Sequence, residues 1–210
     1  LDEVQNYLPE QIRILRSCID PETHALLYVG DLAQQTRLAT IRDWEAVGES
    51  RLVDQAVRLE KVYRHTKQIA QYLAELGYAV AVRDDLRTGP EVQERACTWE
   101  EVLVWLKEIQ MNYPAVSIGC LAHDRSVLKR AEFENLASDQ LRFLTITEAQ
   151  GVEFDVVLFL DLPQPAFLEA DTLLQEERTR VWRDLRYVGL TRAMNALFVA
   201  KISQSLNLHA

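Results

Sequence analysis

The strongest constraint on the fold is an alternation of short, continuous apolar runs with amphipathic stretches of helical period. The runs at residues 25–29, 79–82, 115–122, 154–160 and 196–200 have the length of buried strands, and residues 142–147 are a sixth candidate. Strands that are apolar throughout are typical of parallel sheets covered on both faces. We therefore expect an α/β fold with a mainly parallel sheet and helices on both faces.

Helical signals lie between these runs. Apolar residues of the 66–77 stretch recur at i, i+3, i+4 and i+7, and Gly77 is placed to end that helix. Thr98 and Glu101 form a capping-box pattern ahead of a second apolar face, and Pro9 suits the first turn of another helix. The charged stretch 171–193 is expected to begin as a helix near its first acidic residues.

Composition excludes several classes of protein. The chain has 210 residues, of which 48% are hydrophobic and 26% charged, enough for one large or two small domains. No apolar run approaches the ~18 residues of a membrane span, so we expect no membrane association and a cytoplasmic location. The three cysteines lack C-x-x-C spacing and are interpreted as small core residues. A formal net charge of −9 disfavours wrapping of nucleic acid by bulk electrostatics, so any contact with a polynucleotide must be local.

Polar clusters beside the apolar runs are the candidate functional sites, because ligands of such sheets bind beyond the carboxyl ends of strands. Asp2 and Glu3 form either an exposed acidic terminus or a pair in which Asp2 holds magnesium through water while Glu3 activates a nucleophilic water. Gln34 follows the run at 25–29, within a Gly-Asp turn. It either belongs to an ordinary helix start or contacts a terminal phosphate.

Three further clusters lie in the remainder of the chain. Arg64 is either a solvated cation or a planar fork that pairs with a transferring phosphoryl group. Gly151 and Glu153 lie between two predicted strands, where a glycine turn and a solvated carboxylate would be ordinary. Arg192 precedes the last strand, and its structural interpretation is a cation that complements the C-terminus of a helix.

The order and spacing of these clusters are more specific than any one of them. The segments DEVQ, GDLAQ, YRHTKQI, TITEAQGVEFDVV and YVGLTRA occur in this order between residues 2 and 193. Together they resemble the second through sixth signature motifs of UvrD/Rep-like superfamily 1 helicases. In that family two RecA-like domains enclose ATP, and their closure drives stepping along a single strand of DNA.

The resemblance implies a role for each matching residue. Asp2 and Glu3 would be the magnesium-binding and water-activating carboxylates of the first RecA-like domain, and Gln34 would contact the γ-phosphate. Arg64 and Arg192, from the second RecA-like domain, would reach the phosphates of ATP. Gly151 belongs to the same nucleotide-binding motif as Glu153, which would approach the ribose and phosphate region.

By the same resemblance, residues 1–45 would be the end of the first RecA-like domain and residues 46–210 the second. The segment 40–50 is, from the sequence alone, the best candidate boundary between a short N-terminal piece and the larger remainder. The phosphate-binding pattern G-x-x-x-x-G-K-[ST] is absent from these residues. We therefore expect a fragment that needs the first RecA-like domain as its partner and does not hydrolyse ATP alone.

Three departures from the family pattern point to a subgroup. Gln150 stands where a lysine usually precedes the glycine, and the stretch after Gln34 has no ring before Trp44. Fewer than about 90 residues separate Arg64 from Gly151, too few for a large accessory domain. These features are closer to the helicase IV and HelD-like group, some of whose members remodel RNA polymerase. The alternatives to a helicase are such a remodelling ATPase and a degenerate, non-catalytic interaction module.

Overall fold

A computed structural model describes residues 1–20, 22, 26–47, 57, 64–129, 131–165 and 171–202. The chain forms two compact units, of which the first comprises Leu1–Lys61 and Phe167–Asp184 and the second Val62–Ala166 and Leu185–Ala210. The boundary expected within residues 40–50 separates two motor domains. The division into compact units does not test it, so it stays a prediction. Residues 48–50 of that segment lie outside the described residues.

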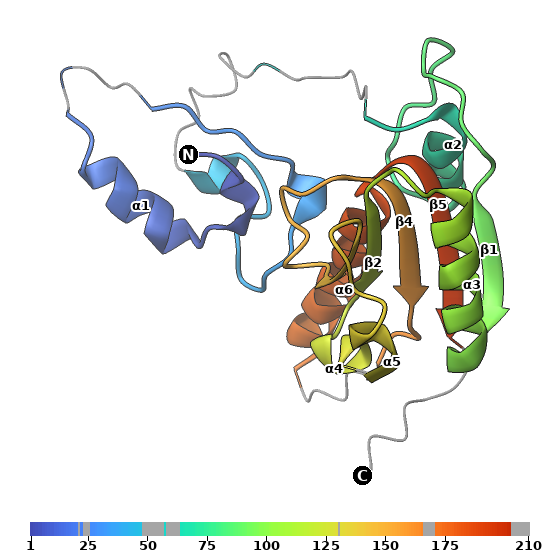
Figure 1. The fold of residues 1–210 in the computed structure, drawn as a ribbon. Helices are drawn as coiled ribbons and strands as arrows, with labels where there is room; N and C mark the ends of the chain where they lie inside the picture. The colour runs from blue at the N-terminus through green and yellow to red at the C-terminus, as the bar shows by residue number, and fades with distance from the viewer. Residues whose placement is uncertain are drawn as a thin grey trace. The chain divides into compact units, whose positions relative to one another are not determined.

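The second unit is built on a five-stranded sheet in which all paired strands are parallel (Figure 1). Its spatial order is β1-β5-β4-β2-β3. The strands are β1 Gln93–Cys97, β2 Ile118–Ala122, β3 Leu141–Thr145, β4 Phe154–Asp161 and β5 Ala193–Ile202. The predicted α/β class with a parallel sheet is therefore confirmed.

Helices cover both faces of this sheet, as expected. Successive residues of β4 point to opposite faces, so that Leu158 joins one apolar core and Phe159 the other. The first core is closed by helix α3, Trp99–Asn112, together with the short helices α4, Arg125–Leu128, and α5, Ala131–Glu134. The second is closed by α2, Lys67–Glu75, and the last turns of α6, Thr172–Leu190.

The predicted helix signals act as expected. The Thr66 side chain accepts a hydrogen bond from the Ile69 N–H at the start of α2, and Gly77 follows the helix with φ of 82°. At α3, Thr98 and Glu101 form both hydrogen bonds of the capping box. The charged stretch 171–193, which was expected to begin as a helix, forms α6 over Thr172–Leu190.

Two predicted strands are wrong, and one strand was not predicted. Residues 79–82 and 26–29 are not strands; Ala25, the first residue of that run, lies outside the described residues. Strand β1 was missed because it is an edge strand whose first four residues are exposed and mostly polar, so no apolar run marks it. Its partner β5 supplies the pairing that makes it a strand.

The first unit has a small core formed by Val4, Ile12 and Ile41. Its helix α1, Pro9–Ser17, begins with proline at its first position, as predicted, and buries Ile12. Short 3-10 turns occupy Val4–Asn6, Leu32–Gln34 and Glu45–Val47. The segment before Val4 runs beside residues 27–29: Val29 donates its N–H to the Leu1 carbonyl at 2.8 Å, and Val4 donates to the Val29 carbonyl at 3.0 Å.

Cys97 and Cys120 are buried core residues, whereas Cys18 is exposed, so its interpretation as a core residue is wrong. Within the part of the chain that the structure describes, no helix is both long and apolar enough to cross a membrane.

Candidate functional site

The candidate site of the second unit lies where β4 and β5 begin. Glu153 directly precedes β4, Arg192 directly precedes β5, and the Phe154 N–H donates to the Arg192 carbonyl at 2.9 Å. The two residues therefore stand on neighbouring strands at the amino-terminal edge of the sheet. The expectation that the site follows the carboxyl ends of strands is wrong for both, because each side chain belongs to the turn that leads into its strand.

Arg64 joins this edge through Glu153. Its Nε lies 2.5 Å from Glu153 Oε1, and the two side chains are 39% and 34% exposed. An ion pair that accessible to water contributes little to stability. Because the contact goes through Nε, the guanidinium still carries its two terminal NH2 groups, which are the groups that bind phosphate as a fork.

Arg192 is buried, with 4% of its surface exposed. Its Nε donates to the Val188 carbonyl at 3.0 Å, and its Nη2 donates to Thr191 Oγ1 at 3.3 Å. These contacts place the cation at the C-terminal end of α6, where a positive charge is favourable. The contacts of Arg192 thus match its interpretation as a cation that complements the C-terminus of a helix. Its position also brings a second guanidinium to the edge that carries Glu153.

His65 belongs to the same cluster, although the amino-acid sequence did not indicate that it would. The ring is 4% exposed, and Nδ1 lies 3.0 Å from the Ala193 carbonyl. Burial lowers the pKa of His65 to about 4, and the charges of Arg64 and Arg192 also lower it. The neutral ring then donates from Nδ1 to that carbonyl, which ties the segment before α2 to the start of β5.

A second polar group lies at the start of β4 and β5. Asp155 Oδ2 accepts hydrogen bonds from the Ser117 hydroxyl at 2.8 Å and the Ser117 N–H at 3.1 Å. Asp155 Oδ1 accepts from Asn195 Nδ2 at 2.9 Å. Ser117 and Asn195 could not be selected from sequence because their partner is remote along the chain, whereas Asp155 stands inside the GVEFD segment.

Gly151 forms the turn that leads into this edge. Its φ of 73° is in the left-handed region that favours glycine, and a Cβ there would have no other atom within 4 Å. Glycine is therefore required by the backbone and not by crowding. This turn therefore shapes the backbone that leads to Glu153, two residues later.

The polar residues predicted in the first unit form a cluster of their own. Gln34 Nε2 donates to Asp31 Oδ2 at 2.8 Å, and the Asp31 N–H donates to Gln5 Oε1 at 3.1 Å. The Gln5 amide donates in turn to the Glu3 carboxylate. Gln5 is buried and connects Glu3 to the Gly-Asp turn, a function that the sequence did not reveal.

Glu3 has an unusual backbone. Its φ of 51° lies in the left-handed region, and its N–H donates to Asp2 Oδ1 at 2.9 Å. A non-glycine residue held there is strained, and such strain often marks functional positions. Both carboxylates are exposed.

These carboxylates fit one kind of metal binding only. Among the described residues, no group of three or more His, Cys, Asp or Glu side chains could hold a metal ion. Mg²⁺, however, is commonly bound by one or two carboxylates, several waters and substrate phosphates. Exposed oxygen donors at Asp2 and Glu3 are suitable for that mode and unsuitable for a cage made of protein alone.

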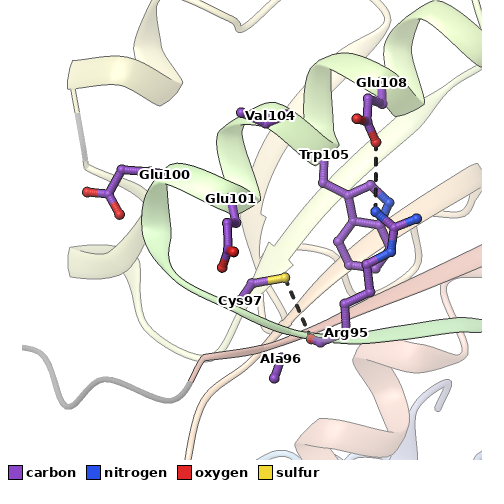
Figure 2. A pocket seen from close by; sticks show the side chains of 8 residues that line it. All are labelled: Arg95, Ala96, Cys97, Glu100, Glu101, Val104, Trp105 and Glu108. Atoms are coloured by element: carbon purple, nitrogen blue, oxygen red, sulfur yellow. Dashed lines mark hydrogen bonds and ion pairs between the residues drawn. The ribbon is translucent and has the colours of Figure 1, made fainter.

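A pocket of about 320 Å³ lies elsewhere in the second unit, between β1 and α3 (Figure 2). Figure 2 shows the Arg95 guanidinium beside Trp105 and Glu108; it lies 4.4 Å from the centroid of the Trp105 ring and 3.8 Å from the Glu108 carboxylate. Glu100 and Glu101 also line it. The pocket is unsuitable for a phosphate, because three glutamates line it and its one arginine is already paired with Glu108.

Comparisons with known proteins show the family of this chain. Residues 45–204 match the UvrD-like helicase C-terminal domain. Over 79 residues the chain is 33% identical to the ATP-dependent DNA helicase PcrA of Bacillus subtilis (strain 168), a match that covers 38% of this chain and 11% of PcrA. The C-terminal domain of a possible DNA helicase from Lactobacillus plantarum WCFS1 has a similar structure, with a TM-score of 0.46 and 15% identity, over 69% of this chain and 89% of that one. Because the family match spans most of its residues, the chain belongs to the UvrD-like helicase C-terminal domain family.

Proposed function

We propose that this chain is the second motor domain, with the end of the first, of an ATP-dependent DNA helicase or translocase. The observation that supports this most directly is the Arg64–Glu153 ion pair on the edge that also carries Arg192. Two guanidinium groups from segments remote in sequence, gathered at one edge of a RecA-like sheet, suit a polyphosphate. The family match supplies the context in which that ligand is ATP.

In this proposal Arg64 acts on the charge that develops during phosphoryl transfer. Glu153 holds the guanidinium through Nε, so that the terminal NH2 groups are oriented before the nucleotide arrives. Preorganised donors of this kind stabilise a transition state because no reorganisation is needed at the moment of reaction. Arginines in comparable phosphoryl transfers contribute about 10³ to 10⁵ in rate. Arg192 would add a second positive charge from the buried side of the same edge.

Residues of the first unit would complete the reaction. Asp2 would hold Mg²⁺ through water, Glu3 would accept a proton from the attacking water, and Gln34 would contact the γ-phosphate. When bound, Mg²⁺ neutralises charge on the phosphate oxygens. Without a phosphate-binding loop in these 210 residues, we propose that the chain alone does not turn over ATP.

The proposal also concerns the polymer along which the motor moves. We propose local contacts with single-stranded DNA in the cytoplasm, because the acidic chain disfavours broad electrostatic binding. The lack of an aromatic residue directly after Gln34 favours, as the second candidate, a HelD-like ATPase that remodels RNA polymerase. A non-catalytic interaction module is the third.

Magnesium-dependent ATP hydrolysis distinguishes these proposals. It should be measured for the 210-residue chain and for a longer protein that joins it to a first motor domain with a phosphate-binding loop. We expect ATP hydrolysis only from the longer protein and not from the 210-residue chain, and we expect single-stranded DNA to stimulate it. Stimulation by RNA polymerase instead would select the remodelling ATPase. A longer protein that binds no ATP and does not hydrolyse it would refute the motor function. The non-catalytic interaction module would then be the remaining candidate.

A further inference from the structure

We propose that Arg87 is a positioning residue that fixes the main chain at Arg64 against the start of β5. Arg87 lies outside the signature segments, in the connection between α2 and β1. The inference rests on the proposed function, because it assigns Arg87 an effect on turnover through Arg64. It names a residue that neither the motif pattern nor the family match singles out.

The Arg87 guanidinium donates to acceptors from two remote segments. Its Nη2 donates to the Arg64 carbonyl at 2.7 Å and to the Met194 carbonyl at 2.7 Å. Its Nη1 donates to Asn195 Oδ1 at 2.6 Å. A planar fork can serve several acceptors in one fixed geometry, which a flexible ammonium cannot do. Arg87 thereby joins the segment before α2 to the second and third residues of β5.

The base of the Arg87 side chain is itself anchored. The Arg87 carbonyl accepts a hydrogen bond from the Lys67 N–H at 2.9 Å, and the Gly89 N–H donates to Gln68 Oε1 at 2.8 Å. A Cβ at Gly89 would lie 2.9 Å from Thr66 Cβ and 3.0 Å from the Asn195 carbonyl. The connection therefore packs against the first turn of α2 and the start of β5, which keeps the guanidinium over its acceptors.

The contacts continue from Arg87 toward Glu153. Asn195, which receives Nη1, donates to Asp155, and Asp155 stands two residues after Glu153 at the start of β4. Arg87 is thus linked to both members of the Arg64–Glu153 pair, through the main chain on one side and through Asn195 and Asp155 on the other. Loss of this link would loosen the Arg64 segment, which His65 still ties to the Ala193 carbonyl, without removing any group proposed to contact phosphate.

The expected signature is a loss in kcat with little change in KM. If Arg64 acts mainly in the transition state, displacing it lowers kcat while ground-state binding is retained. Arg87 is exposed, so its removal leaves no buried cavity, and the fold should survive. Arg83 is a matched control, because it is an exposed arginine of the same connection that pairs with Asp85 at 2.8 Å.

ATP turnover should be compared in the longer protein for Arg87→Ala, Arg87→Lys and Arg83→Ala. We expect Arg87→Ala to lower kcat about tenfold with KM for ATP within about twofold of the parent, and Arg87→Lys to recover part of the loss. Arg83→Ala should match the parent. Equal kcat for both alanine variants, or a loss confined to KM, would overturn the positioning role.

A second measurement separates this inference from the proposed function. In the 210-residue chain, NMR of the Arg64 Nε–Hε group reports the ion pair with Glu153 directly. Arg87→Ala should accelerate its hydrogen exchange at least about fivefold, whereas Arg83→Ala should not. Unchanged exchange would overturn the inference. A longer protein without any turnover would overturn the proposed function, and with it the effect on kcat, even if exchange responds.

Discussion

The buried His65 makes stability depend on pH in a defined window. Its pKa is lowered from 6.5 to about 4, chiefly by burial, so the folded chain keeps the ring neutral where the unfolded chain protonates it. Stability is therefore fully present above pH 6.5 and is lost as the pH falls toward 4. The interval between the two pKa values, at 1.36 kcal/mol for each pH unit, corresponds to a maximum loss of about 3 kcal/mol.

Urea unfolding at pH 7.5 and pH 5 measures this loss, with His65→Gln as the reference. Glutamine can donate to the Ala193 carbonyl but does not titrate, so the difference between the two proteins removes the contribution of other groups. Between pH 7.5 and 5 the parent should lose about 2 kcal/mol more than the variant. An NMR titration of the His65 ring should show no midpoint above about pH 5. Equal pH dependence in both proteins, or a midpoint near 6.5, would refute the burial argument.

Three predictions concern the stability of the amino-terminal edge of the sheet. Gly119→Ala should lower the free energy of unfolding by about 1–3 kcal/mol, because its Cβ would lie 2.6 Å from the buried Phe154 ring; Gly151→Ala, strained by φ alone, should cost about 1 kcal/mol. Equal urea midpoints for the glycine variants and the parent would contradict this. Arg192→Ala should cost about 2 kcal/mol because it removes the hydrogen bonds of a buried cation to the Val188 carbonyl and to Thr191 Oγ1, although the carbonyl keeps the Thr191 hydroxyl as a donor at 2.9 Å. A calorimetric melting temperature identical to that of the parent would show that this contact is dispensable.

The sequence predicted the parts of the fold that are decided locally. Strand β4 was found because all of its central residues are buried between two layers and must be apolar. The cap at Thr98 was found because its partner Glu101 is three residues away. Strand β1 was missed because nothing local distinguishes an exposed, polar edge strand from a loop.

The candidate site shows the same division. Arg64, Glu153 and Arg192 were selected because they stand at fixed places within known motifs. His65 and Arg87 were not, because their partners at the start of β5 are more than a hundred residues away. Their hydrogen bonds depend on the completed sheet, and the sequence between the partners carries no trace of that contact.

Removal of Arg64 is the sharpest test of its proposed role in phosphoryl transfer. Steady-state ATP hydrolysis should be measured for Arg64→Ala and Lys67→Ala in the longer protein. Lys67 is a nearby cation whose side chain pairs with Asp84 at 2.9 Å, away from the proposed chemistry. We expect Arg64→Ala to lower kcat by about 10² or more, while Lys67→Ala stays within about twofold of the parent. Near-normal turnover by Arg64→Ala would contradict the assignment of this edge to phosphoryl transfer.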